Sequence, residues 1–574
     1  MPKTTRHKLL WVLGACAVAL AAVHCFAIYT DSINWDEFAM FSRAEDTIRS
    51  GVLAGGGRPG LATLLFVPLV RGCHDIMDVA HHARIVTTVA TFAFFVGLYV
   101  LLRALLVGVR KNPDLDAAFG VALLLCVPVV LRWSVHARSD QWALGCGIWG
   151  GVALLASRKR LHYAWLAGCL FGVGFLFSQK VSYAVGLMAL LVAGRQVLVP
   201  ELQLKRELMR LASCALTGAV VVLVFLAYAR AAFKQLPPLE SPWDAYAFYR
   251  TVAGYRVYFG ISTTLGPHIA LAVLMVIASI RCRDASMWRQ LGLAWAVLLM
   301  GFGVAVVHPS TFPYFWMTIG LFPAVAGALV LDPVRQLFSS ARLWNLIAVA
   351  LWLALLVPTI PASLRMTADS QRVQRDAQSF VNRNFPRDAL GFHPEGALAC
   401  RPDPAPFPIY FSNDIAREFR DPAAITAFIR LFASKPVAFI VTSYRLLHFP
   451  IPIQNFWTQH YVPYGPGVLV PGFVSGTNAD ERRTFSVLVP GEYRWRTDAD
   501  GAGADVDGKV LQPGDTIVLA RGNHSLRPVE SGRAGALTYA ISSPPSPSFD
   551  FYSASMVSEL VTGFAESDVT APPR

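Results

Sequence analysis

An acidic pair, Asp36-Glu37, stands shortly after the first apolar stretch of the chain. A hydroxyl group that attacks a sugar carbon must lose its proton, and one well-placed carboxylate can accept that proton. A hydrolase that cleaves glycosidic bonds would need a second carboxyl group to protonate its leaving group, whereas a phosphate leaving group needs no such help. The pair therefore predicts that Asp36 or Glu37 is the catalytic base of an inverting transfer from a phosphate-linked donor.

The same pair also has a structural interpretation. Asn34 can cap a helix in which Glu37 is the third residue, which makes a capping box. Four apolar residues then share one face of that helix, as expected of a helix lying on a membrane: Phe38, Phe41, Ala44 and Ile48. If Glu37 serves the cap, Asp36 is the preferred base. The residues alone favour the two interpretations about equally.

Other polar residues stand at the ends of later apolar stretches. The cations expected to bind the donor phosphate are Lys180, Arg138 and Arg58, and lysine acts there as a compact point charge. The residues expected to position a substrate are Asp140, His308 and Tyr314. Purely structural roles remain open for these residues. A cation at the end of a span can reach the interface by snorkelling, Arg138 and Asp140 can form a local ion pair, and Tyr314 can belong to an aromatic belt.

Membrane spans are the elements that must position these residues. The 574-residue chain is 54% hydrophobic and only 15% charged, with a mean hydropathy of +0.46, whereas soluble domains carry about 25% charged residues. A shorter apolar stretch, 61–70, is too short to cross a bilayer core and predicts a partial or re-entrant element. The long apolar runs predict eleven spans, near residues 9–29, 83–108, 116–132, 141–156, 162–179, 181–198, 209–230, 264–281, 290–307, 312–331 and 343–361.

The net charge of +13 arises largely in short loops between these runs, such as Arg158-Lys159-Arg160 and Lys205-Arg206. Such loops are typical of the cytoplasmic side, so the charge does not indicate a nucleic-acid partner. With the N-terminus in the cytoplasm, eleven crossings place every basic loop inside and the C-terminal region outside. The sequence thus predicts a multi-pass protein of a bacterial inner membrane, surrounded by membrane lipids, whose candidate site faces the periplasm.

Cysteine usage gives no sign of a metal or disulfide framework. Seven of the nine cysteines lie in or beside apolar runs, and only Cys73 and Cys400 are candidates for loop positions. There is no CxxC pair and no spacing typical of zinc ligands. We therefore expect cysteine to be small core filler and predict no metal site. No dense cluster of carboxylates favours a divalent metal cofactor, and a requirement for one is left open.

The composition changes after the last predicted span, and four regions are expected. Residues 1–361 form the transmembrane domain, and residues 362–470 an external mixed α/β region. Residues 471–545 read as a small β-sandwich-like domain, with a hairpin turn at Asp507-Gly508. The remaining tail, 546–574, is expected to be only partly ordered.

The order and sidedness of these short motifs resemble the C-type superfamily of membrane glycosyltransferases (GT-C), in particular the branch of protein O-mannosyltransferases and lipid A aminoarabinose transferases. The resemblance is carried by Asp36-Glu37, Arg138 with Asp140, Lys180 and Pro313-Tyr314-Phe315. The segment Gly57–Gly60 departs from the His-Pro-Pro-Leu-like segment common in that family, which puts a role for Arg58 in doubt.

The resemblance implies an all-α polytopic membrane domain followed by an external β-rich domain. It implies a polyprenyl-phosphate-linked sugar donor, with Asp36 as the base or acceptor-positioning group and with Lys180 and Arg138 on the donor phosphate. The acceptor, whether lipid, glycan or protein, is left open. The alternative is a transporter or flippase of lipid-linked glycans, which often has inverted repeats and charges near the bilayer midplane; here no repeat is visible and the candidate polar residues gather at one face.

Overall fold

The computed structural model describes residues 3–53, 60–72, 75–108, 113–198, 204–234, 265–282, 284–307, 315–336, 359–398, 400–404, 418–497, 502–531 and 534–545, together with single positions at 110, 338, 340, 357 and 415. Three predicted site residues, Arg58, His308 and Tyr314, lie outside these ranges, so their roles stay predictions. Most of the predicted span 343–361 and the tail 546–574 also lie outside them.

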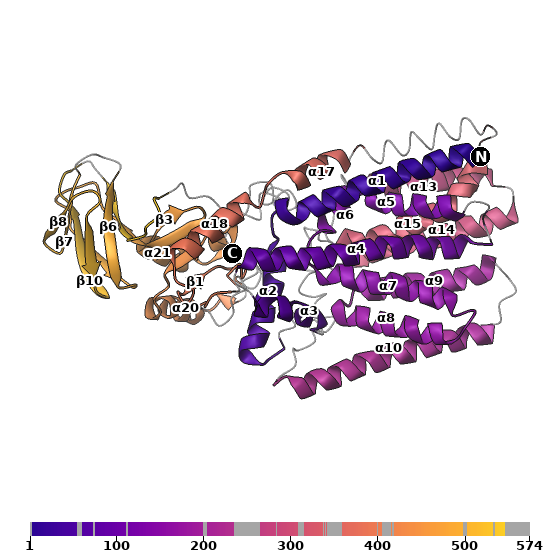
Figure 1. The fold of residues 1–574 in the computed structure, drawn as a ribbon, viewed down its shortest axis with the longest axis horizontal. Coiled ribbons are helices and arrows are strands. Elements are labelled where there is room, and N and C mark those ends of the chain that lie inside the picture. Colours follow the sequence, from indigo (N-terminus) through magenta and orange to yellow (C-terminus); the bar gives the residue numbers. More distant parts are fainter. Residues whose placement is uncertain are drawn as a thin grey trace.

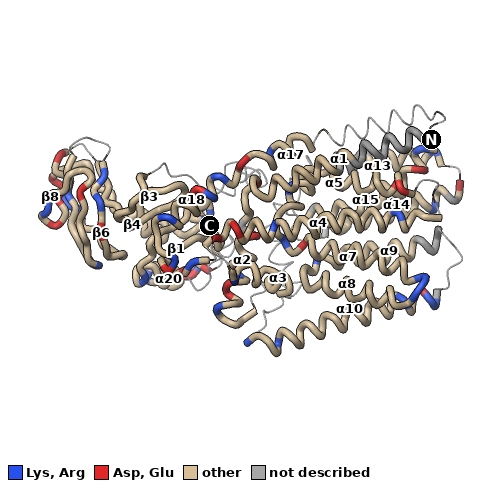
Figure 2. Tube along the Cα trace, viewed as in Figure 1, with Lys and Arg blue, Asp and Glu red and all other residues tan. Residues whose placement is uncertain are grey.

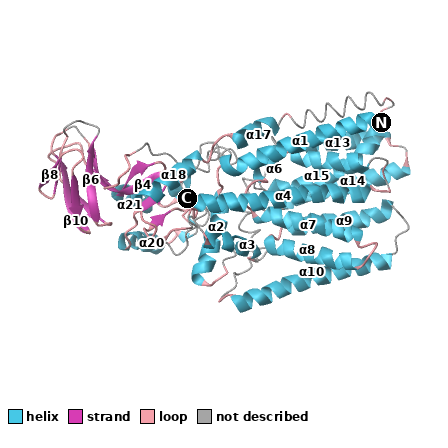
Figure 3. Cartoon of the chain, viewed as in Figure 1, coloured by secondary structure: helices cyan, strands magenta, loops and turns pink. Residues whose placement is uncertain are grey.

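The N-terminal part of the chain is a bundle of long helices (Figure 1; Figure 3). Its helices are α1 (Lys3–Thr30), α4 (Ile76–Leu106), α5 (Pro113–Leu125), α6 (Pro128–Trp133), α7 (Ser139–Ala156), α8 (His162–Phe177), α9 (Val181–Leu198), α10 (Leu204–Ala232), α13 (Leu265–Arg281), α14 (Ala285–Val307) and α15 (Trp316–Gln336). They coincide with ten of the predicted spans. The predicted span 116–132 is divided into α5 and α6, because Pro128 starts a new helix there.

These helices have the composition of membrane spans. In the described part of the chain, four are long and apolar enough to cross a bilayer: Ile76–Leu106, Lys205–Ala232, Met287–Val306 and Met317–Gln336. Several shorter apolar helices accompany them. Figure 2 shows Lys and Arg gathered at the ends of α8 and α10 farthest from the strands, and the middle of the bundle almost free of charge. The chain is thus an integral membrane protein, and the count of eleven spans stays a prediction.

Helix α15 is buried almost completely, whereas few residues of α10 are buried, as expected for a helix with one side towards lipid. Helices α8 and α10 approach each other through small residues: Gly168 and Gly172 face Cys214, Gly218 and Val221. A side chain at either glycine would collide with the α10 backbone. Small residues permit this packing because two apolar helices in lipid associate mainly through close contact.

Helices α2 (Trp35–Ser50) and α3 (Leu61–Arg71) lie between the bundle and the C-terminal region (Figure 1). The predicted capping box is present: Asn34 accepts from the α2 backbone, and the Glu37 carboxylate accepts from the Asn34 backbone. Phe38, Phe41 and Ala44 are buried on one face, as the pattern predicts. That face packs against α3 and the C-terminal region, which corrects the expectation that it rests on the membrane. Helix α3 has 11 residues, about 16 Å of helix, so it cannot cross the bilayer core.

The C-terminal region contains α17 (Thr359–Thr367), α18 (Arg372–Asn384), α20 (Pro422–Ser434), the short 3-10 helix η3 (Tyr444–His448), α21 (Ile451–His460) and two sheets. The larger sheet has the order β1-β2-β4-β11-β6-β9, with β3 paired to β4. Its strands are β1 (Gly391–Phe392), β2 (Phe439–Val441), β3 (Tyr461–Gly465), β4 (Val468–Val474), β6 (Gly491–Thr497), β9 (Thr516–Leu519) and β11 (Gly535–Tyr539).

The smaller sheet has the order β5-β10-β7-β8 and consists of β5 (Arg483–Val487), β7 (Ala504–Val506), β8 (Lys509–Leu511) and β10 (Gly522–Pro528). A core that includes Trp495 and Leu537 from the larger sheet and Leu526 from the smaller one joins the two. The predicted hairpin is confirmed, because Asp507 and Gly508 link β7 to β8 with positive φ angles of 51° and 87°. Strand β4 pairs with β2, β3 and β11 and so joins the mixed region to the strands that follow it.

Buried amides fasten the C-terminal region to the loop between α1 and α2. The Gln371 side chain donates to the backbone oxygens of Ile28 and Asp31 at 2.9 and 2.7 Å. The Gln374 amide exchanges two hydrogen bonds with the Ile33 backbone, at 2.7 and 2.9 Å. Both glutamines are fully buried. The C-terminal region therefore helps to shape the loop that carries the predicted base.

Candidate functional site

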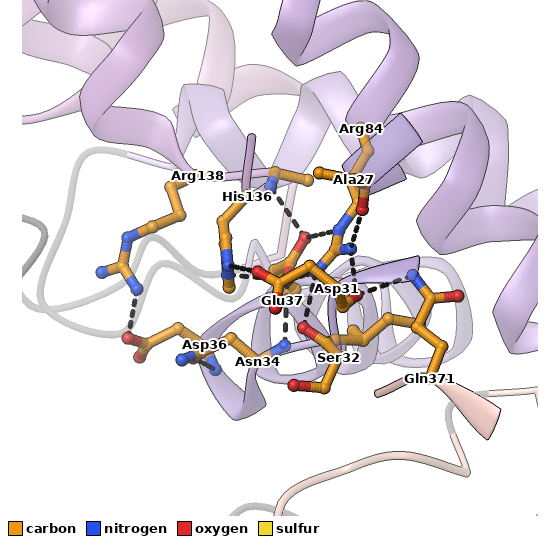
Figure 4. Close-up of polar contacts among 12 residues, drawn as sticks. Ala27, Asp31, Ser32, Asn34, Asp36, Glu37, Arg84, His136, Arg138 and Gln371 are labelled. Atoms are coloured by element: carbon orange, nitrogen blue, oxygen red, sulfur yellow. Dashed lines mark hydrogen bonds and ion pairs between the residues drawn. The ribbon is translucent and has the colours of Figure 1, made fainter. Parts of the chain in front are cut away.

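A buried arginine organises the loop between α1 and α2. Arg84 of α4 donates to the backbone oxygens of Asp31 and Ser32 at 2.6 and 2.8 Å, and more weakly to that of Ala27 at 3.3 Å (Figure 4). Carbonyl groups at the end of a helix lack partners within that helix, so the guanidinium both satisfies them and complements the negative end of the α1 dipole.

Glu37 is enclosed by donors on every side. Its Oε1 accepts from Arg84 Nε at 2.9 Å and from the Ala137 backbone at 2.8 Å. Its Oε2 accepts from Arg84 Nη2 at 2.7 Å and from the Asn34 backbone at 2.9 Å, and His136 Nδ1 lies 3.1 Å away. Burial would raise the pKa of Glu37, but the Arg84 guanidinium and His136 outweigh it and hold the pKa well below its ordinary value. This carboxylate ties α2 to α4 and to the loop before α7.

A second buried carboxylate, Asp31, lies on the other side of His136. His136 Nε2 is 3.0 Å from Asp31 Oδ2, and Arg132 Nη2 is 3.2 Å from Asp31 Oδ1. Burial would raise the pKa of Asp31, but Arg132 and His136 lower it to about 2. Asp31 is therefore ionised at neutral pH, and it fixes the segment between α6 and α7.

Asp36 points away from this group and meets a different cation. Its Oδ2 accepts a hydrogen bond from Arg138 Nη1 (Figure 4). Arg138 is the cap residue of α7 and its side chain is 3% exposed, whereas the Asp36 side chain is 23% exposed. The pair thus has a buried cationic end and an accessible acidic end.

Arg138 continues the chain of charges towards Asp140 and Lys180. Arg138 Nε lies 3.9 Å from Asp140 Oδ2, and Lys180 Nζ lies 3.0 Å from the same oxygen. Ser178 Oγ donates to Asp140 Oδ1 at 2.8 Å. The Lys180 ammonium also stands 5.6 Å from the centroid of the Phe315 ring, a distance that suits a cation–π contact. Acidic and basic side chains therefore alternate from Asp36 through Arg138 and Asp140 to Lys180.

The structure thus brings together five predicted site residues from the start of α2, the start of α7 and the segment between α8 and α9: Asp36, Glu37, Arg138, Asp140 and Lys180. No role was predicted from the sequence for Asp31, Arg84 or the buried glutamines. A signal for Arg84 existed, because a charge at the start of an apolar span is rare and usually has a dedicated partner. No pattern in the sequence could show that Gln371 and Gln374 reach back to this loop.

Metal binding has no support in the described ranges, 3–53 through 534–545 with their gaps. There, no group of three or more His, Cys, Asp and Glu side chains is arranged to hold a metal ion. The carboxylates of the site are instead neutralised by arginine, lysine and histidine.

Comparison with solved structures gives the fold. ArnT from Cupriavidus metallidurans bound to undecaprenyl phosphate matches with a TM-score of 0.51 at 14% identity, over 80% of this chain and 97% of that chain. The apo state of the same ArnT matches with a TM-score of 0.51 at 12% identity, over 81% and 98%. The chain has the GT-C fold. The resemblance inferred from the motifs is thereby confirmed for the fold.

A further match to a GT-C protein is the oligosaccharyltransferase from Archaeoglobus fulgidus in complex with Zn and sulfate, with a TM-score of 0.41 at 10% identity, over 92% of this chain and 98% of that chain. No family model and no curated protein matches the sequence. In this GT-C fold the Asp36–Lys180 chain of charges lies where the bundle meets the C-terminal region, near α2 and α3 (Figure 1).

One expectation about cysteine is wrong. In the part of the chain that the structure describes, six cysteines are free and most of these are buried or half-buried, as predicted, but Cys400 of the C-terminal region is disulfide-bonded. The spacing of cysteines could not reveal this, because a lone pair of distant cysteines has no sequence signature.

We expect Cys73 to be the partner of Cys400. Asp75, two residues further along, lines the same small cavity as Cys400, whereas the remaining candidate, Cys16, lies within the apolar helix α1. Peptide mapping without reduction should recover Cys73 and Cys400 in one cross-linked peptide, and Cys400→Ser should abolish it. Cys126→Ser, a change at a buried free cysteine, should leave the cross-link in place. A cross-link to any other cysteine would contradict the pairing.

Proposed function

We propose that this protein is a membrane glycosyltransferase that moves a sugar from a polyprenyl-phosphate-linked donor to an acceptor hydroxyl at the external face. One observation carries the assignment of the base. Within the charged cluster, the Asp31, Glu37 and Asp140 side chains are 1%, 0% and 4% exposed, whereas Asp36 is 23% exposed. Asp36 is therefore the carboxylate of this cluster that an acceptor can reach. The GT-C fold supports the reaction class.

The proposed step is a single displacement. The acceptor oxygen attacks the anomeric carbon, and the Asp36 carboxylate takes the hydroxyl proton. The bond between that carbon and the phosphate oxygen breaks, its electron pair leaves with the polyprenyl phosphate, and the configuration of the anomeric carbon inverts. Arg138 and Lys180 supply positive charge for the leaving phosphate. Asp140, which accepts hydrogen bonds from both Ser178 and Lys180, orients Lys180 and so has the substrate-positioning role expected of it.

The pairing of Asp36 with Arg138 gives an order to the reaction. Before the donor binds, Arg138 neutralises Asp36, which weakens that carboxylate as a base. A donor phosphate offers Arg138 and Lys180 a competing anion. As Arg138 turns to the phosphate, Asp36 regains its basicity beside the sugar. We therefore expect the donor to bind before the acceptor.

The location of the site supports a periplasmic reaction at a bacterial inner membrane. Basic residues gather at the opposite end of the helices (Figure 2), which is typical of the cytoplasmic side. The disulfide at Cys400 favours an oxidising compartment for the C-terminal region.

A release assay tests the proposal against the flippase alternative. Purified protein in nanodiscs is given a panel of undecaprenyl-phosphate-linked hexoses and aminoarabinose, with lipid A vesicles, a soluble oligosaccharide or a serine- and threonine-containing peptide as acceptor. A transferase should release free undecaprenyl phosphate in the presence of one acceptor. A flippase should move the labelled donor across a vesicle bilayer without releasing that phosphate, and this result would refute the proposal.

Removal of the Lys180 charge should weaken the donor site. Lys180→Met is expected to raise the KM for the donor and the Kd for undecaprenyl phosphate by about 10–100-fold, because a hydrogen bond to a charged group contributes about 1.5–3 kcal/mol. Binding is measured by titration of undecaprenyl phosphate into the nanodisc-embedded protein. Lys509→Met, at an exposed position of β8, removes the same charge far from the bundle and should change neither constant. Equal affinities for Lys180→Met and wild type would exclude Lys180 from the phosphate site.

A further inference from the structure

A short polar segment of the C-terminal region lies next to the candidate site. It consists of Ser443, Tyr444 and Arg445, at the start of η3. Ser443 Oγ caps η3 by accepting from the Arg445 backbone at 3.1 Å. Arg445 Nε donates to the Tyr444 hydroxyl oxygen at 3.2 Å, and the guanidinium carbon stands 5.7 Å from the centroid of the Tyr444 ring. The position of the Tyr444 side chain is thus coupled to that of Arg445.

A buried carboxylate holds this segment in place. Glu395 Oε1 accepts from Ser443 Oγ at 2.7 Å and lies 3.2 Å from Arg445 Nε. His393 Nε2 lies 3.3 Å from Glu395 Oε2, while His393 Nδ1 accepts from the backbone of Glu395 and Ala397. Burial lowers the pKa of His393 to about 3, so the ring is neutral and its proton is on Nε2. Glu395, Ser443 and Arg445 are all buried, and the contacts of Glu395 with the other two hold the segment in place.

This support contacts the helix that carries Asp36. The His393 ring lies 6.5 Å from that of Phe38 in an edge-on arrangement, and Phe38 is two residues after Asp36. Phe38 and Phe439 of β2 belong to one apolar cluster, and Tyr444 packs against that cluster. Burial raises the pKa of the Tyr444 phenol; Arg445 opposes this shift, and Glu395 and Asp36 add to it. The ring contact between His393 and Phe38, together with the electrostatic effect of Asp36 on Tyr444, therefore places Tyr444 near the first turn of α2.

We propose that Tyr444 contacts the acceptor as its hydroxyl approaches Asp36, and that the acceptor is a sugar. A half-buried tyrosine offers a flat apolar face, which suits the ring of a sugar, together with a polar edge. The acceptor sugar belongs either to a glycolipid headgroup or to a soluble glycan. This inference rests on the proposed function, because it assigns the second substrate of the same reaction.

Two-substrate kinetics test the inference with the donor and acceptor pair that supports release by the wild-type protein. Tyr444→Leu keeps an apolar side chain but removes the ring, and it should raise the acceptor KM about three- to tenfold with an unchanged donor KM. Tyr444→Phe keeps the ring and should stay within about threefold of wild type. Leu447→Ala alters a side chain of η3 that is 73% exposed and should change neither KM. Thermal unfolding of each variant reports whether the C-terminal region stays intact.

Comparing the acceptors of the release assay distinguishes the two possible sources of the acceptor sugar. Turnover with lipid A vesicles alone indicates a glycolipid, and turnover with the soluble oligosaccharide indicates a free glycan; either result supports a sugar acceptor. Turnover with the peptide alone would overturn the inference while leaving glycosyl transfer standing. An unchanged acceptor KM in Tyr444→Leu, or an equal rise in both KM values, would also overturn it. A wild-type protein that releases no undecaprenyl phosphate with any pair would refute both the proposed function and this inference.

Discussion

Asp36→Asn is expected to reduce the kcat for release of undecaprenyl phosphate by about 10²–10⁴-fold, the usual contribution of a general base. The amide has nearly the same shape as the carboxylate but cannot take the proton of the acceptor hydroxyl. It can still accept a hydrogen bond from Arg138, the partner of Asp36 in the resting site. The donor site should therefore survive, and undecaprenyl phosphate should bind at least as tightly as it does to the wild-type protein, because a neutral amide competes less with the phosphate for Arg138.

Asp46→Asn provides the matched control for this change. Asp46 lies on the same helix, ten residues after Asp36, is 34% exposed and pairs with Arg49 at 3.3 Å. Its variant should retain wild-type kcat, which would show that loss of one negative charge from α2 is not enough. Undiminished turnover in a correctly folded Asp36→Asn protein would eliminate Asp36 as the base.

Glu37→Ala should unfold or strongly destabilise the protein, in contrast to Asp36→Asn. The change leaves the Arg84 guanidinium buried without its carboxylate partner, since both side chains are 0% exposed. Breaking a buried ion pair by removing one partner costs about 3–5 kcal/mol, and loss of the capping box adds about 1 kcal/mol. We expect a lower midpoint of thermal unfolding and a smaller monodisperse fraction in size-exclusion chromatography.

The exposed ion pair of Glu481 and Arg483 provides the control for Glu37→Ala. Its atoms are 3.0 Å apart and its side chains are 50% and 49% exposed, so Glu481→Ala should change stability by no more than about 1 kcal/mol. Glu37→Ala would support a catalytic role for Glu37 only if it kept wild-type stability and lost turnover. That outcome would reverse the assignment of Asp36 as the base and Glu37 as the structural carboxylate.

Local patterns in the sequence were sufficient for most of the secondary structure. Ten runs of apolar residues predicted the described helices of the bundle, one of the runs being divided into α5 and α6, because each run satisfies its own backbone hydrogen bonds in lipid. The capping box at Asn34 and Glu37 and the turn at Asp507-Gly508 were predicted for the same reason, since each depends on residues within one turn. The one apolar face that was misplaced is that of α2, because amphipathic periodicity shows that a face is buried but not whether lipid or protein covers it.

The candidate site itself required the tertiary structure. The sequence determined which residues could do chemistry and that they gather at one end of the bundle. Only the fold showed that Arg84, 47 residues from Glu37, satisfies that carboxylate, and that Arg138, 102 residues from Asp36, pairs with the exposed one. Two adjacent acids thus received different environments, one sealed by donors and one open to an acceptor. Burial and charge pairing arise from contacts between distant segments, and no local pattern encodes them.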